Sequence, residues 1–151
     1  MQRVTETLDN MDYAILSALE ENGRITITDL AAKVGLSKTP CQIRMKRLEE
    51  EGFINGYFAK INYDKLGHHL LVFVQVKMAD TRTSAIQEFH REVLRIKEVE
   101  ECYMTASTFD YLLKVRTKDM TIYRDILADV IAALPNVSHT TTSVVMQEVK
   151  E

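Results

Sequence analysis

The distribution of glycine constrains the fold of this chain more than any other feature. All five glycines lie between Gly23 and Gly67, and none follows. Glycine adopts the backbone conformations that end helices and form tight turns. The first part of the chain is therefore predicted to contain short elements separated by turns, and the rest longer regular elements. This asymmetry predicts two domains, which is compatible with a length of 151 residues.

Composition and charge exclude several classes of protein. Apolar residues make up 46% of the chain and charged residues 27%, which is typical of a folded protein. A net charge of −3 means that any contact with a polyanion must be local. No basic segment followed by an apolar run opens the chain, and no stretch approaches the ~20 apolar residues of a membrane helix. We therefore expect a cytoplasmic protein with no membrane association.

Two cysteines, Cys41 and Cys102, are too few for a disulfide framework. Each is also too far from a second cysteine or histidine for the ligand spacing of a zinc site. Both are predicted to be small buried hydrophobic side chains. We expect neither a metal nor a cofactor.

Three short helices are predicted in the first part of the chain. Asp9 is a good N-cap for the first, which ends before Gly23. The second covers about 28–34 and is closed by Gly35, and the third covers about 37–51. The short connection between the last two is typical of a helix-turn-helix. After the third helix, a short strand or hairpin is predicted to lead into a linker.

The second part of the chain alternates between strand and helix patterns in the order βαββαβ. The predicted elements are strand 70–78, helix 82–97, strand 99–105, strand 109–116, helix 119–134 and strand 138–149. This order is that of a ferredoxin-like domain. The predicted fold class is therefore α+β, with a helix-turn-helix domain over 1–58, a linker over 59–69 and a ferredoxin-like effector and oligomerisation domain over 70–151.

One face of the predicted sheet has no helix to cover it, because two helices can cover only one face of four strands. Along the first strand, Leu71 and Phe73 share this second face with Gln75 and Lys77. A surface that is partly apolar and partly charged suits burial against another subunit better than free solvent.

The third helix carries a local positive charge. On a helical wheel, Cys41, Met45 and Leu48 fall in one narrow sector that must face the core. Residues 38–48 contain four cations and no acid, in a chain whose net charge is −3. The opposite side is formed by Thr39, Ile43, Lys46 and Arg47, and it is flanked by Pro40 and Gln42. A cationic helix end of this kind is suited to DNA phosphates.

Several of these residues have a specific use on DNA. Ser37 and Thr39, with the N–H groups of the helix start, can hold a phosphate. Gln42 can recognise adenine, Lys46 or Arg47 guanine, and Ile43 a thymine methyl group. Alternatively, the cations form a solvated surface and the isoleucine packs on a neighbouring loop.

Arg44 lies beside the core side of the wheel. An ion pair with a nearby acid and a contact with a DNA phosphate are both open for this side chain.

The stretch LSKTPCQIRMKRLEEEGFINGYFAKIN resembles the signature of the Lrp/AsnC, or feast/famine, transcriptional regulators. LDNMDYAILSALEENGR resembles their first helix, and LLVFVQV, ECYMTASTFDYLLKVRT, DMTIYRDIL and SVVMQEVK extend the likeness along essentially the whole chain. The resemblance implies a sequence-specific regulator that binds double-stranded DNA and acts on amino-acid metabolism genes. It also implies dimers joined through the ferredoxin-like domain, which assemble to octamers, and an amino acid bound between dimers near the turn joining the second and third strands.

The resemblance also indicates which residues form the two sites. The recognition region that it implies contains Ser37, Lys38, Thr39, Pro40, Gln42, Arg44, Lys46 and Arg47. The candidate effector residues are Met104, Thr105, Ser107, Thr108 and Asp110.

The effector turn departs from the family at Ser107, where members usually have glycine. A side chain here narrows the room for a ligand and disfavours positive φ. Asp110 is a natural partner for an amino acid's ammonium group. Alternatively, it caps the turn and pairs with Lys114 or Arg116.

Two other functions compete with the regulator. Siroheme decarboxylases resemble the same two-domain architecture, but His68, His69, His90 and His139 lack ligand or triad spacing. A metabolite-sensing or assembly module without DNA function would not need four cations on one helix. The sequence therefore favours a regulator that is not an enzyme.

Overall fold

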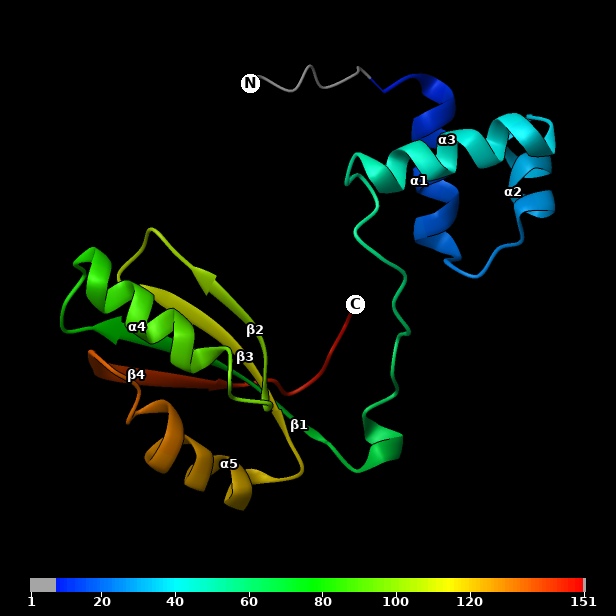
Figure 1. The fold of residues 1–151 in the computed structure, drawn as a ribbon. Coiled ribbons are helices and arrows are strands. Elements are labelled where there is room, and N and C mark those ends of the chain that lie inside the picture. The colour runs from blue at the N-terminus through cyan, green and yellow to red at the C-terminus, as the bar shows by residue number, and fades with distance from the viewer. Residues whose placement is uncertain (1–7, 151) are drawn as a thin grey trace. The chain divides into compact units, whose positions relative to one another are not determined.

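The computed structural model describes residues 8–150. The chain divides into two compact units, one ending at Lys60 and the other beginning at Ile61 (Figure 1). Among the described residues, no helix has both the length and the apolar character needed to cross a membrane.

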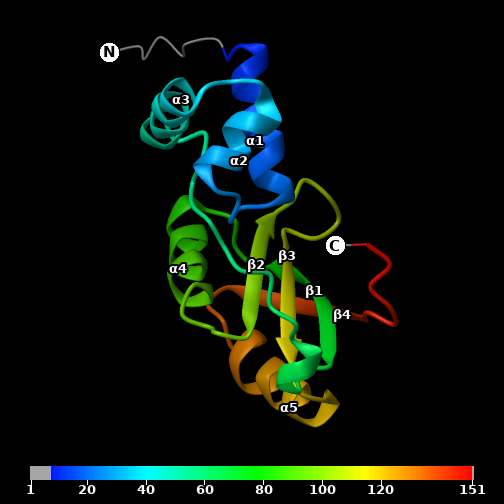
Figure 2. The same cartoon turned by 90° about the vertical axis from the view of Figure 1, so that its right-hand side faces the viewer.

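The first unit contains the three predicted helices, α1 (Asn10–Glu21), α2 (Ile27–Val34) and α3 (Lys38–Glu50). Asp9 is the N-cap of α1 and forms a capping box with the third helical residue, as its sequence position indicates. Gly35 ends α2 with φ of 72°, a left-handed conformation that favours glycine. Figure 2 shows the three helices gathered together. The helix-turn-helix prediction is confirmed.

The core of the first unit lies between the three helices. From α3, Cys41 and Leu48 are completely buried, and Met45 packs against them. The helical wheel therefore identified the inward side of this helix. Burial also raises the pKa of the Cys41 thiol, so this side chain behaves as a hydrophobic residue. The other buried members are Ile15, Ala18, Leu19, Leu30 and Ala31.

The predicted strand or hairpin after α3 is wrong. Residues 53–63 form an extended segment without strand pairing, followed by the short helix η1 (Asp64–Leu66). Aromatic and β-branched residues favour strands only where a partner strand and a packing surface exist. Phe58 instead points into solvent with 89% of its surface exposed. Tyr57 donates a hydrogen bond of 2.8 Å to Glu49.

The second unit has the predicted βαββαβ order. Its elements are β1 (Leu70–Met78), α4 (Thr83–Val93), β2 (Val99–Met104), β3 (Tyr111–Thr117), α5 (Met120–Ile126), the π-helical continuation η2 (Leu127–Ile131) and β4 (Val137–Val144). All pairings are antiparallel in the order β2-β3-β1-β4. The ferredoxin-like prediction is confirmed.

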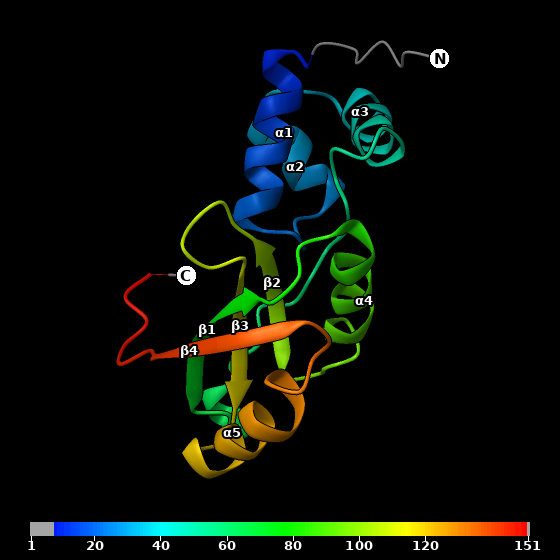
Figure 3. The same cartoon turned by 90° about the vertical axis from the view of Figure 1, so that its left-hand side faces the viewer.

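Some element ends differ from the predictions. The helix expected to reach residue 97 ends at Val93, and the last strand ends at Val144 instead of 149. The pairing of β4 with β1 places Val144 opposite Val72, close to the start of β1. Val145 N still donates to Leu71 O at 3.0 Å, one residue from the start of β1, and Figure 3 shows the remaining residues leaving the sheet as an irregular segment.

Both long helices of this unit cover the same face of the sheet. Val74 and Leu113 lie opposite each other on neighbouring strands and are fully buried. Phe89 from α4 and Tyr123 from α5 complete the same core. Apolar residues that alternate along a strand therefore form one side of a single core, as the sequence pattern predicts.

The opposite face of the sheet mixes apolar and charged side chains. Phe73 lies opposite Lys114, and Leu71 lies opposite Arg116. Arg116 is only 8% exposed and donates to Glu100 at 2.7 Å. The mixed character expected from the sequence is present, and the charges on this face are paired.

Candidate nucleic-acid interface and effector turn

The outward face of α3 carries most of the candidate DNA contacts. Ile43, in the middle of this face, is 65% exposed, so the alternative that it packs on a loop is wrong. A hollow of about 390 Å³ lies beside it, lined by Asp9, Thr39, Pro40, Ile43, Arg44 and Arg47. The exposed candidates are Ser37, Lys38, Thr39, Pro40, Gln42, Ile43 and Lys46. Five of the nine predicted recognition residues thus line one hollow, and the other four are exposed without lining it.

The two arginines of this face contact carboxylates at the start of α1. Arg44 Nη1 lies 2.7 Å from Asp9 Oδ2 and 2.8 Å from Asp12 Oδ1. Arg47 Nη2 lies 2.6 Å from Asp12 Oδ2. The ion-pair alternative for Arg44 is thus present, and Arg47, predicted to point outward toward guanine, is also drawn toward α1. Both arginine side chains remain about a third exposed, at 30% and 31%.

Sequence reasoning missed Asp12 as part of this surface, although it identified the residue as the third position of a helix. Its side chain is 1% exposed. Burial alone would raise the pKa of this carboxyl, but the N–H of Asp9 and the guanidinium groups of Arg44 and Arg47 lower its pKa to about 2. Asp12 is therefore ionised at neutral pH. The signal available in the sequence was an acid in the first turn of α1, in a unit whose third helix carries four cations and no acid over residues 38–48.

The remaining charges of α3 are more exposed. Lys46 lies 3.4 Å from Glu50, and both side chains are mostly exposed, so this pair contributes little to stability. Lys38 is exposed and has no ion pair among the described residues. The N-cap, Ser37, makes no side-chain capping hydrogen bond to the first turn. These features leave lysine charge and helix N–H groups for a phosphate.

The turn between β2 and β3 holds four of the five effector candidates. Thr105 N donates to Asp110 O at 2.8 Å, and Thr105 Oγ1 donates to Phe109 O at 2.9 Å. Ser107 Oγ accepts from Phe109 N at 3.3 Å. Among the non-glycine residues described, only Asn136 has positive φ. The turn therefore forms with serine at the position where glycine is usual.

The carboxylate of Asp110 is already engaged. Its Oδ2 accepts from Met78 N at 2.8 Å and lies 3.2 Å from Lys77 Nζ. The Met78 N–H, and then Lys77, lower the pKa of Asp110. The alternative in which Asp110 pairs with Lys114 or Arg116 is wrong, because its cationic partner is Lys77. Lys114 pairs with Glu101 of β2, and Arg116 pairs with Glu100 of the same strand.

A cleft of about 300 Å³ lies close to this turn. One of its walls carries a hydrogen bond of 2.8 Å between His90 Nε2 and the hydroxyl of Tyr111. Among the five effector candidates, only Met104 lines the cleft, and it is 62% exposed. The complete lining is His90, Val93, Leu94, Cys102, Met104 and Tyr111. Sequence reasoning missed the contribution of α4, because long-range packing places this helix beside β2.

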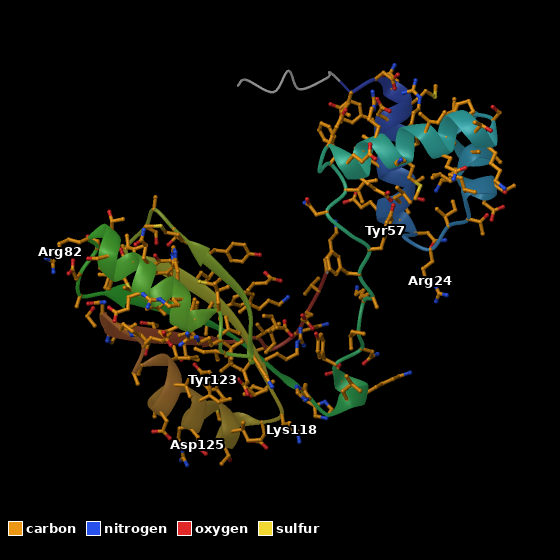
Figure 4. All side chains as sticks on the ribbon, viewed as in Figure 1. Arg24, Tyr57, Arg82, Lys118, Tyr123 and Asp125 are labelled. Carbon is orange, nitrogen blue, oxygen red and sulfur yellow. The ribbon has the colours of Figure 1, made fainter. Side chains whose placement is uncertain are left out.

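Within residues 8–150, no group of three or more histidine, cysteine or acidic side chains is arranged to hold a metal ion. Figure 4 shows the distribution of side chains over the two units.

Comparisons with known proteins match both units. Residues 8–55 match a family model described as winged helix-turn-helix DNA-binding, and residues 71–151 match the Lrp/AsnC ligand binding domain. A proline dehydrogenase transcriptional activator of Rhizobium radiobacter is 54% identical over 97% of this chain and 94% of its own length. The leucine-responsive regulatory protein of Escherichia coli K12 is 42% identical over 99% of this chain and 92% of its own length.

Solved structures give the same result. A transcriptional regulator from Neisseria meningitidis, in complex with L-Met, superposes with a TM-score of 0.91 at 32% identity and covers 96% of this chain and 94% of its own. A feast or famine regulatory protein from M. tuberculosis, complexed with L-methionine, superposes with a TM-score of 0.88 at 32% identity and covers 96% of both chains.

The fold, the cationic face of α3 and these relatives together define a DNA-binding transcriptional regulator with a separate ligand-binding domain. The relatives are regulators and activators by name, so an enzymatic role has no support among them. The chain belongs to the Lrp/AsnC family.

Proposed function

We propose that this regulator recognises specific DNA sequences with the outward face of α3. The observation that carries the proposal is an isoleucine, Ile43, exposed beside two guanidinium groups held in place. An exposed apolar group between hydrogen-bond donors is suited to the edges of bases in a major groove, where a thymine methyl and guanine acceptors lie. The proposed contact residues are Ser37, Lys38, Thr39, Pro40, Gln42, Ile43, Arg44, Lys46 and Arg47.

The residues of this surface divide by role. Lys38, Ser37 and Thr39 lie at the start of α3 and contact phosphates, which set the register of the protein on the duplex. Gln42, Ile43 and the arginines contact base edges. A dimer presents two copies of α3 to successive major grooves.

In the second unit, the proposed ligand is an amino acid near the turn between β2 and β3. Met104, Thr105, Ser107, Thr108 and Asp110 remain the proposed effector residues. The support is the complexed L-methionine of two structural relatives and the amino-acid-related names of the sequence relatives. We infer that the chain acts in the cytoplasm on genes of amino-acid metabolism.

The mixed open face of the sheet is the proposed dimer surface, and dimers assemble further to octamers. Phe73 and Leu112 are half-buried on this face beside paired charges. A second copy of the same face would cover both the apolar groups and the ion pairs. Linking several weak contacts with half-sites raises the overall avidity for DNA.

The test is fluorescence anisotropy on the duplex that the purified chain enriches most from a randomised library. A shuffled duplex of the same composition is the reference, at one fixed salt concentration. We expect tighter binding to the enriched duplex, and a change in that binding on addition of proline, leucine or methionine. Equal affinity for both duplexes would show that the chain does not recognise sequence.

A matched pair of variants places the site on α3. Ile43→Ala should weaken binding to the enriched duplex. The same change at another exposed apolar residue of the unit, Phe58→Ala, should leave it unchanged, because that side chain lies on the segment after α3. If the two variants behave alike, the assignment of this face is wrong.

A further inference from the structure

A buried carboxylate on α1 holds both arginines of the recognition face. Asp12 Oδ1 accepts from Arg44 at 2.8 Å, and Asp12 Oδ2 accepts from Arg47 at 2.6 Å. The same Oδ2 accepts from Asp9 N at 3.0 Å, which is the capping-box bond of α1. One side chain thus joins the start of α1 to two successive turns of α3.

This arrangement is an inefficient way to obtain either stability or attraction to DNA. Removing a carboxylate from water has a large desolvation cost, and an apolar residue in the same place often stabilises a protein as well. An ionised acid beneath the recognition face also cancels positive charge that would attract phosphates. What Asp12 does supply is geometry, because a guanidinium bonded to a fixed carboxylate loses its freedom to rotate.

The geometry bears directly on the recognition face. Each carboxylate oxygen takes one arginine, so Arg44 and Arg47 are held on either side of a single anchor. Both side chains line the hollow beside Ile43, and about a third of each stays accessible there. A guanidinium has five N–H donors, so bonding to Asp12 leaves the group able to donate elsewhere as well.

We propose that Asp12 is a positioning residue for sequence discrimination. It fixes the directions of the Arg44 and Arg47 donors before DNA arrives, so that recognition does not require the two long side chains to be ordered at that moment. The inference rests on the proposed DNA-binding face of α3. Asp12 itself touches no base, and it acts through the two arginines.

The test compares the full-length chain with Asp12→Asn, using the library-enriched duplex and its shuffled counterpart across a series of salt concentrations. Asparagine keeps the shape of the side chain but removes its charge. Discrimination between the two duplexes should fall about tenfold, because Arg47 loses its ion pair with Asp12 and Arg44 is then held by Asp9 alone of the two acids. Affinity for the shuffled duplex should rise, and the slope of log K against log salt should steepen by up to ~0.9, because one unit of positive charge is released.

A purely structural role gives a different result. Partial unfolding lowers the affinity for both duplexes by the same factor and leaves their ratio unchanged. An unchanged ratio in folded Asp12→Asn would therefore overturn the inference. Failure of the wild-type chain to distinguish the two duplexes would instead overturn the proposed function, on which the inference depends.

Asp29→Asn is the matched control. Asp29 occupies the same third position in α2, where its N–H donates to Thr26 and its carboxylate accepts from the same hydroxyl. The substitution removes an equal charge from the same unit but touches neither arginine. We expect it to leave the discrimination ratio at the wild-type value.

A second variant covers the case in which Asp12→Asn does not fold. Asp12→Glu keeps the charge and displaces the carboxylate by one methylene. The salt slope should stay at the wild-type value while discrimination falls. Wild-type discrimination in this variant would show that charge alone matters and would overturn the positioning role.

Discussion

Asp12 in the first unit and Asp110 in the second are both ionised acids with lowered pKa values, but their partners differ. Asp12 is bonded to the guanidinium groups of two arginines whose side chains reach the surface. Asp110 is bonded to the Met78 N–H and to an exposed lysine. The first acid therefore orients groups that can contact a partner, whereas the second ties its turn to the backbone at the end of β1.

This difference indicates how each acid responds to a ligand. The Asp12 carboxylate is 1% exposed, so no ligand can reach it without opening the unit. The Asp110 side chain is 19% exposed, and 47% of the Lys77 side chain is accessible. Because the lysine of this ion pair is exposed, we expect the pair to be weak enough for another ammonium group to replace it.

The largest expected effect is on DNA binding, when Arg47, one of the two arginines bonded to Asp12, is removed. Arg47→Ala should weaken binding to the enriched duplex by about 10- to 100-fold, because a fixed guanidinium contact with a base contributes about 1–3 kcal/mol. Fluorescence anisotropy at constant salt measures the change, and light scattering should show an unaltered oligomer.

Arg24→Ala provides the control for that variant. Arg24 is an exposed cation in the loop between α1 and α2 (Figure 4). Removing it deletes the same charge without touching α3. If both variants weaken DNA binding equally, Arg47 contributes only general electrostatic attraction. Asp12 then orients no specific contact, and the contrast drawn with Asp110 is wrong.

The next effect is a loss of stability in acid. The pKa of Asp12 lies near 2 in the folded chain, against an ordinary value of 3.8. A lowered pKa stabilises the fold above the ordinary value, and this contribution of about 2 kcal/mol disappears as the pH falls from 4 to 2. Hydrogen exchange of the α1 amides, followed over this pH range, measures it.

Asp12→Asn should lack this part of the acid dependence, because it has no proton to gain. Carboxylates whose lowered pKa values come from other partners, such as Asp80 and Asp110, titrate in both proteins and cancel in the difference. Parallel pH curves for wild type and variant would contradict the assigned pairing.

A smaller effect is expected at the other acid. Lys77→Gln should tighten amino-acid binding by up to about fivefold, because it removes the ammonium group that competes for Asp110 while the Met78 N–H still holds the carboxylate. Isothermal titration calorimetry with methionine, leucine and proline measures the change. Lys118→Gln, at another exposed lysine of the unit, is the control. Weaker binding in Lys77→Gln would place the ligand's ammonium elsewhere.

The smallest effect belongs to the departure from the family pattern. Ser107→Gly should cost about 1 kcal/mol of stability or less, because it loses the long bonds to Phe109 and gains backbone freedom in the unfolded chain. If serine restricts the effector turn, the glycine variant should bind the amino acid more tightly than wild type. Equal affinities would show that the turn accepts either residue, and calorimetry distinguishes these outcomes.

Local signals predicted most of the architecture. Asp9, Gly35 and the alternation of Val72, Val74 and Val76 act over a few residues, and each produced the expected cap, helix end or buried face. The strand expected after α3 failed because strand formation depends on a partner that no local pattern can specify.

The sequence by itself determined the helices, the order of helices and strands along the second unit and the core-facing side of α3, because periodicity and caps are properties of neighbouring residues. Only the tertiary structure decided the partners of the charged groups. Asp12 and Arg47 form an ion pair although they are far apart in the chain. Asp110 pairs with Lys77, whereas the sequence had suggested Lys114 or Arg116 as an alternative. A long flexible side chain can pair with any of several opposite charges, and the packing of the backbone decides which of these charges lie within its reach.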